Sequence, residues 1–74
     1  MTPENALANY FRMKQFAMGQ RFVKARVVSS LAARGLPPDT VEETVERWEA
    51  AGLIREHADH TISLTPAAYP HVAP

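Results

Sequence analysis

Apolar residues recur at helical spacing near the start of the chain. Leu7, Phe11 and Met18 fall on one face at helical spacing, and a helix is predicted at about residues 3–17. Thr2 precedes that stretch and can accept a hydrogen bond from the first turn, as helix-capping threonines do. The pattern therefore predicts an amphipathic first helix with one buried side.

A second helix is predicted at about residues 22–34. Val23, Val27 and Leu31 recur every fourth residue and form its apolar stripe. Gly35 follows, which suits the left-handed residue that often ends a helix. Leu36 and two consecutive prolines come next, and because the prolines cannot continue the helix, a tight turn is expected there.

A third helix is predicted at about residues 39–51, with Gly52 as its end. Asp39 is expected to cap it, and Glu42 three positions on completes a capping-box pattern. One side of this helix is apolar at spacings of three and four residues. The residues on that side are Val41, Thr44, Val45 and Trp48.

A hairpin is predicted at about residues 53–65, where apolar residues alternate with threonine and serine. Ala58 and Asp59 are expected at its turn. Residues 66–74 contain three prolines and are expected to form a loose tail with a short turn over residues 66–69.

The length of 74 residues indicates one domain, residues 1–74, of the mainly α class with a small β-hairpin. The chain has no cysteine, no apolar signal sequence and no stretch long enough to span a membrane, so a cytoplasmic protein is expected. No serine, histidine and acid arrangement indicates catalysis, and so short a chain has little room for a large pocket. We therefore expect no enzyme and no cofactor, and no small-molecule substrate is evident.

Charge divides the chain into two halves. Residues 1–36 carry six lysines and arginines against one glutamate, a net charge of +5. Residues 37–74 carry two arginines against seven acids, a net charge of −5. This division predicts a basic side and an acidic side, unless the fold interleaves them, and makes a homo-oligomer plausible.

Two segments carry a family resemblance. Residues 40–55, TVEETVERWEAAGLIR, resemble the third helix and first wing strand of winged helix-turn-helix regulators of the MarR-like group. Residues 63–67, SLTPA, resemble the strand exit of the same proteins. The resemblance covers about residues 22–68 and is specific for the superfamily, not for one family. It implies three helices plus a two-stranded wing, with the helix at 39–51 in the position that reads DNA.

The exposed positions of that helix depart from the DNA-binding pattern. Small polar or basic residues, commonly Ser-Arg, are usual where Glu42 and Glu43 stand in this chain. A row of carboxylates should repel the phosphates that DNA-binding proteins neutralise with cations. The row is either a partner-binding surface or an ordinary solvated helix face; its members are Asp39, Glu42, Glu43, Glu46 and Glu49.

Two functions remain open. The first is a small DNA-binding transcription regulator or accessory factor, phage- or plasmid-encoded, that contacts the backbone of double-stranded DNA with basic residues around the first two helices. Its candidate residues are Arg21, Lys24 and Arg26, which cluster with Arg12 and Lys14 around the junction of the first two helices, together with Arg47 of the third helix and Arg55 of the wing. Solvation, or pairing with acids of the third helix, would equally account for these cations. The alternative is an adaptor or inhibitor that binds a protein partner through Asp39, Glu42, Glu43 and Glu46.

Two of the three histidines flank the hairpin turn, and the third lies in the tail. They are His57, His60 and His71. Without cysteine they make at best a weak metal site, and none is predicted. Trp48 is expected in the core because it shares the apolar side of its helix.

Overall fold

The computed structural model describes residues 2–14 and 19–72 of the chain. These residues form a mixed α/β fold of four α-helices, one 3-10 turn and a three-stranded antiparallel sheet. In chain order the elements are α1 (Pro3–Lys14), β1 (Arg21–Val23), α2 (Lys24–Ala32), α3 (Pro38–Ala50), β2 (Ile54–Glu56), β3 (Thr61–Leu64), η1 (Pro66–Ala68) and α4 (Tyr69–Val72).

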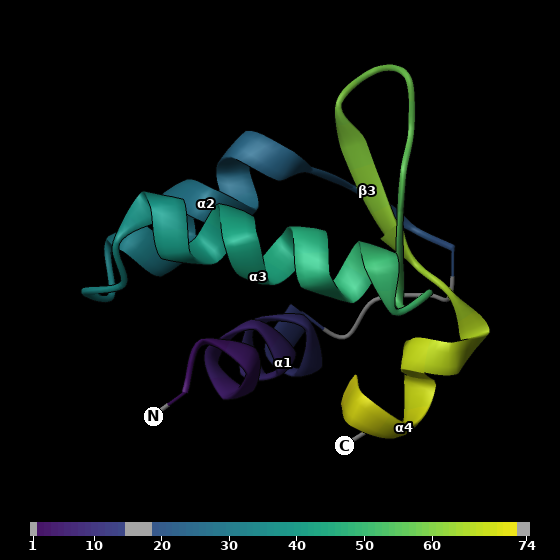
Figure 1. Cartoon of the computed structure of the whole chain (residues 1–74), viewed down its shortest axis with the longest axis horizontal. Coiled ribbons are helices and arrows are strands. Elements are labelled where there is room, and N and C mark those ends of the chain that lie inside the picture. Colours follow the sequence, from purple (N-terminus) through teal and green to yellow (C-terminus); the bar gives the residue numbers. More distant parts are fainter. Residues whose placement is uncertain (1, 15–18, 73–74) are drawn as a thin grey trace.

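Helix α3 runs through the middle of the molecule, with α1 packed on one side of it and α2 on the other (Figure 1). The hairpin of β2 and β3 projects from the end of α3, and α4 lies against α1 (Figure 1). The strand order is β1-β3-β2, so β1 lies beside β3 although half the chain separates them. Helices α1 and α2 thus hold α3 from two sides and leave one side of it exposed.

The core is organised around Phe11, whose side chain is almost fully buried. Its ring meets Tyr10 edge-on at 5.4 Å and Phe22 edge-on at 5.2 Å, and lies 6.4 Å from the ring of Trp48. Such edge-to-face pairs stabilise a core beyond the area they bury. Phe11 therefore joins α1 to β1 and to α3. The other large buried side chains include Leu7, Val27, Leu31, Val41, Val45, Ile54, Ile62 and Leu64.

Helix α1 begins as the sequence predicts. The Oγ1 atom of Thr2 accepts a hydrogen bond from the backbone N–H of Asn5 at 3.1 Å, as a capping threonine does. The helix is described up to Lys14, and the predicted continuation to residue 17, with Phe16 and Met18, lies outside the described residues. Met13 is exposed, in contrast to the buried Leu7 and Phe11 of the same helix.

The prediction that residues 22–34 form a helix is wrong at its start. Phe22 and Val23 belong to strand β1, in which Phe22 pairs with Ile62 and Val23 with Thr61. The strand alternates, so Phe22 packs against the core while Val23 is half exposed. Pairing with a strand far along the chain overrides the local helical spacing, and the sheet has three strands where two were predicted.

The turn between α2 and α3 follows the predicted chemistry at Gly35 but not at Asp39. Gly35 has a φ of +99°, and the next residue, Leu36, donates its backbone N–H to the carbonyl of Leu31 at 3.3 Å. Helix α3 starts at Pro38, so Asp39 lies inside the first turn and makes no capping hydrogen bond. Proline suits a first helical position because the missing N–H has no partner there anyway.

Gly52 turns the chain from α3 into the hairpin with a φ of +79°. Thr65, which directly follows β3, fixes this junction, because its hydroxyl donates to the carbonyl of Gly52 at 2.5 Å and its N–H to that of Leu53 at 3.0 Å. The hairpin turn lies at Ala58 and Asp59, as predicted.

Within the segment expected to be a loose tail, residues 66–72 form η1, in the place of the predicted short turn, and α4. Ala68 of η1 and Val72 of α4 are buried in the core. Arg12 of α1 donates from Nη2 to the carbonyl oxygen of His71 at 2.9 Å, and the imidazole lies 6.3 Å from the ring of Trp48. These contacts could not be predicted from the local, proline-rich sequence, because they join residues from opposite ends of the chain.

The position of Phe11 predicts a large effect on stability. Phe11→Ala should lower the free energy of unfolding by about 3 kcal/mol or more, because it empties the centre of the core. Phe11→Leu keeps most of the volume and should cost about 1 kcal/mol. Urea unfolding followed by circular dichroism measures both. Met13→Ala, on the exposed side of the same helix, is the matched control and should change stability by about 0.5 kcal/mol at most; equal losses at the two positions would contradict the packing.

Candidate functional site

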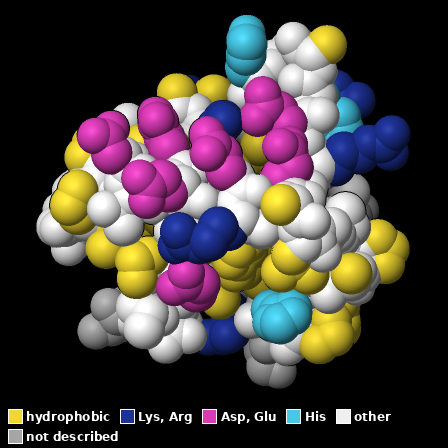
Figure 2. All heavy atoms as spheres, in the orientation of Figure 1, with side chains coloured by type: hydrophobic (Ala, Val, Ile, Leu, Met, Phe, Trp, Pro, Cys, Tyr) yellow, Lys and Arg dark blue, Asp and Glu magenta, His cyan; other side chains and the backbone are white. Residues whose placement is uncertain are grey.

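Five carboxylates lie exposed along one side of α3, and this set is called the acidic face. The apolar residues of α3 point into the core, which leaves the acids at intervening positions to face solvent. Figure 2 shows acidic side chains gathered over α3 and the adjoining hairpin. The acidic face consists of Asp39, Glu42, Glu43, Glu46 and Glu49.

The acidic face has no counter-charge of its own. Arg47 is the one cation of α3, and its Nη2 atom donates to Oε1 of Glu4 on α1 at 2.7 Å and to Oγ1 of Thr44 at 3.1 Å. Within residues 2–14 and 19–72, no ion pair involves any of the five carboxylates. Like charges three and four positions apart on a helix cost a few tenths of a kcal/mol per pair. The row therefore lowers the stability of α3 slightly and leaves its negative charge available to a partner.

Two predicted DNA-binding cations are paired with acids of the hairpin. Lys24 Nζ lies 3.0 Å from Glu56 Oε1, and Arg21 Nη1 lies 3.4 Å from Asp59 Oδ2. The acidic partners of these two cations come from β2 and the hairpin turn, not from α3. The basic and acidic halves of the chain thus interleave at the sheet, and the predicted separation of charge holds only in part.

The structure splits the predicted set of DNA-binding residues. Arg47 contacts α1, whereas Arg21 and Arg55 occupy one row across the sheet, since each pairs in register with Ser63 of β3. Arg26 lies on α2. Arg26 and Arg55 are exposed and form no ion pair in the described part of the chain.

Three cations surround a groove of about 280 Å³ between the end of α1, β1 and the start of α2. Lys14 reaches over the ring of Tyr10, with Nζ 5.1 Å from its centroid, a distance at which a cation is attracted to the ring. Sequence reasoning placed these cations near one another along the chain but could not find the groove, because β1 was not predicted. This basic groove is lined by Tyr10, Lys14, Gln20, Arg21, Phe22, Val23 and Arg26.

The histidines do not gather into a metal site. His57 Nε2 lies 2.8 Å from Oγ of the buried Ser63, while His60 occupies the hairpin turn and His71 lies on α4. In the described ranges no three residues among histidine, cysteine, aspartate and glutamate are placed to hold a metal ion. His57 instead satisfies a buried hydroxyl on the sheet.

Comparisons of the chain with protein-family models, curated proteins and solved structures found no match.

None of the helices in residues 2–14 and 19–72 combines the length and the apolar character needed to cross a membrane.

Hydrogen bonding lowers the pKa of two carboxyl groups. At Glu4 the largest cause is a hydrogen bond from its own backbone N–H at the start of α1, followed by the hydrogen bond from Arg47. At Asp59 the hydroxyl of Thr61, which donates to Oδ1 at 2.6 Å, is the largest cause of the lowered pKa. Both carboxylates therefore stabilise the fold when the pH is above their ordinary pKa. This stabilisation is lost as the pH falls through the lowered pKa of the folded state.

Thr61→Val is expected to raise the pKa of Asp59 toward its ordinary value, because it removes the hydroxyl donor while keeping a β-branched residue in the strand. Titration of the side-chain carboxyl carbon by NMR measures this shift. The pKa of Glu4 in the same variant is the internal control and should stay lowered. An unchanged Asp59 titration would show that the hydroxyl is not its main partner.

Proposed function

We propose that the chain is a winged helix-turn-helix protein in which α2, the turn at Gly35 and α3 form the helix-turn-helix and the β2–β3 hairpin forms the wing. The order of elements supports this assignment, as does the resemblance of residues 40–55 to the third helix and first wing strand of MarR-like regulators. In this arrangement α3 occupies the position of a recognition helix.

The function we propose is protein interaction: the acidic face binds a cationic surface of a partner protein, as an adaptor or inhibitor would. The observation that carries the proposal is the row of five exposed carboxylates without ion pairs on α3, within the described residues. Complementary charge steers association and selects the partner. Arg47, the one cation of α3, forms an ion pair with Glu4 of α1. It therefore does not neutralise any carboxylate of the acidic face.

The same row argues against groove reading by α3. Affinity for duplex DNA comes largely from neutralising phosphates with lysine and arginine. Asp39, Glu42 and Glu43 occupy the first turns of α3, the part of a recognition helix that contacts base edges. A glutamate can accept a hydrogen bond from cytosine, but a row of acids adds repulsion along the whole approach.

Neutralising two members of the acidic face tests this function. Glu42→Gln combined with Glu46→Gln should weaken binding of a short poly-lysine peptide roughly fivefold at low salt, since exposed charge pairs contribute about 0.5 kcal/mol each. Isothermal titration calorimetry measures the affinity. The variant should fold at least as stably as the parent, because a like-charge pair four positions apart is removed.

The matched control is Glu56→Gln combined with Asp59→Asn, which removes the same charge from the hairpin. If the acidic face is the binding surface, the control should lose much less affinity than the α3 variant. Equal losses in the two variants would mean that the peptide senses net charge only, and the proposal would then be wrong.

A second candidate function is binding to the backbone of double-stranded DNA. The observation that favours it is the basic groove, where Lys14, Arg21 and Arg26 converge, with Arg55 exposed on the same row of the sheet as Arg21. Such a regulator would hold DNA by phosphate contacts away from α3, with affinity that is largely independent of sequence. Two of the cations assigned to it from sequence, Arg21 and Lys24, would first have to leave their hairpin partners.

Arg26→Glu distinguishes this second function. If the basic groove holds DNA, the substitution should weaken binding to random duplex DNA and reduce the slope of log affinity against log salt by about 1. Fluorescence anisotropy at several salt concentrations measures both quantities. Arg34→Glu, an equal charge reversal beyond the other end of α2, is the control and should have a smaller effect. A parent protein that does not bind random duplex DNA at low salt excludes this candidate.

A further inference from the structure

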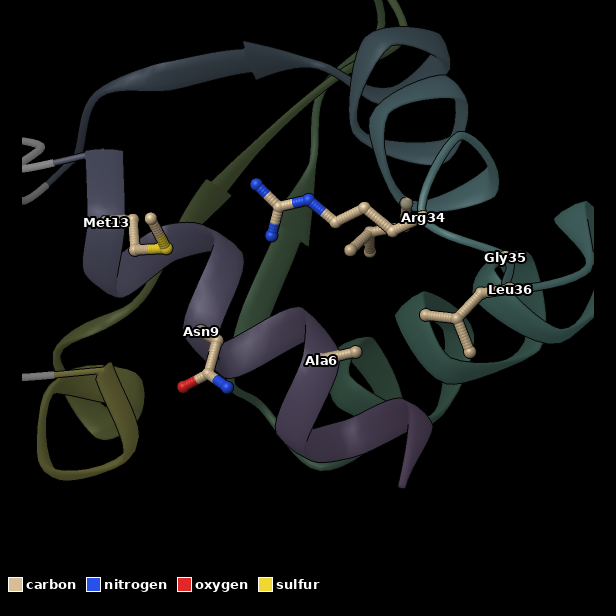
Figure 3. Close-up of a pocket in the computed structure, with 7 residues that line it drawn as sticks. Ala6, Asn9, Met13, Arg34, Gly35 and Leu36 are labelled. Atoms are coloured by element: carbon tan, nitrogen blue, oxygen red, sulfur yellow. The ribbon is translucent and has the colours of Figure 1, made fainter. Parts of the chain in front are cut away.

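A second groove, of about 570 Å³, lies between α1 and the turn that links α2 to α3 (Figure 3). It shares no residue with the acidic face or the basic groove, so neither proposed function uses it. This apolar groove is lined by Ala6, Asn9, Met13, Leu31, Arg34, Gly35 and Leu36.

The surface of the groove is mostly hydrocarbon. Ala6 and Leu31 are buried core residues that form its base, and Leu36 packs against the core at one side. Met13, on the other side, is 71% exposed. Methionine adapts its shape to varied apolar ligands because its side chain is unbranched and polarisable. An apolar chain placed here would therefore cover hydrocarbon that otherwise contacts water.

Polar side chains in the groove are donors. Arg34 is the one charged residue among the described residues that line it, and it forms no ion pair within them. Its side chain extends from the end of α2 toward α1, where Asn9 and Met13 lie (Figure 3). Asn9 Oδ1 accepts a hydrogen bond from Arg12 Nη1, which leaves the amide nitrogen of Asn9 to donate. A guanidinium and an amide donor beside hydrocarbon suit a carboxylate.

We propose that the apolar groove binds a small amphipathic carboxylate, with its hydrocarbon chain over Ala6, Leu31 and Leu36 and its carboxylate on Arg34. The volume falls in the range of about 300–1,000 Å³ typical of small-molecule sites, which also combine apolar walls with a few polar groups. A second protein chain would need roughly 800 Å² of surface on each partner. The groove, with seven lining residues, is far smaller than that.

Octanoate, used below the concentration at which it forms micelles, is the probe. The methyl groups of the methionines are labelled with carbon-13, and the Met13 signal is assigned from its disappearance in Met13→Leu. Octanoate should shift the Met13 signal saturably in the parent protein. A shift that grows linearly without saturation would overturn the proposal.

Two comparisons test the role assigned to Arg34. Arg34→Gln should weaken octanoate binding about tenfold, because hydrogen bonds to a charged group contribute about 1.5 kcal/mol or more. Arg26→Gln, an equal loss of charge outside the groove, should leave it unchanged. Octanol should bind the parent more weakly than octanoate does, and its affinity should be the same for the parent and for Arg34→Gln. Equal octanoate affinity in the two arginine variants, or octanol binding as tight as octanoate, would overturn the proposal.

Arg34→Lys gives a further readout if the glutamine variant proves unstable by circular dichroism. Lysine keeps the charge but lacks the planar guanidinium with its two parallel donors. The affinity of Arg34→Lys for octanoate should therefore lie between those of the parent and Arg34→Gln. If Arg34→Gln does not fold, the expected affinity of Arg34→Lys is roughly threefold to fivefold below that of the parent. An affinity equal to that of the parent would contradict recognition of the carboxylate by hydrogen bonds from the Arg34 guanidinium.

Discussion

The packing of Phe11 against Phe22 and Trp48 is the contact on which the rest of the structure depends. These three rings come from α1, β1 and α3, and the contact fixes the mutual position of those elements. It holds β1 beside the helices, where the strand can pair with β3 and bring Arg21 toward Lys14. It also anchors α3 by Trp48, so that the opposite side of that helix, with its carboxylates, faces solvent. One aromatic cluster thus positions both charged surfaces.

Sequence reasoning predicts the parts of the fold that depend on local spacing. The buried stripe of α3, the left-handed Gly35 and Gly52 and the hairpin turn all follow from residues within one or two turns of one another. Strand β1 and helix α4 could not be predicted in the same way. Phe22 pairs with Ile62 of β3, which lies in the other half of the chain, and Val72 is buried on α4, which packs against α1.

The candidate surfaces also differ in whether they depend on local spacing or on contacts between distant parts of the chain. The acidic face could be predicted because all its residues lie on one helix, and the periodicity of α3 decides which side they share. The ion pairs of Lys24 with Glu56 and of Arg21 with Asp59 could not, since each joins residues more than thirty positions apart. The net charges of the two halves therefore predicted a basic side and an acidic side. The ion pairs of the hairpin bring some of these opposite charges together. The apolar groove depends on how the α2–α3 turn meets α1, which no local pattern contains.

The bond from Arg12 to the carbonyl of His71 spans 59 positions of the chain. With the burial of Val72 and the approach of His71 to Trp48, it makes the last helix part of the core that the first helix begins. During synthesis, the surroundings of Trp48 are therefore incomplete until residue 72 has left the ribosome. Contacts of such long sequence separation slow folding, because the chain must close a large loop before it gains them. The elements from α1 to α4 should accordingly fold as one cooperative unit, with no stable amino-terminal half.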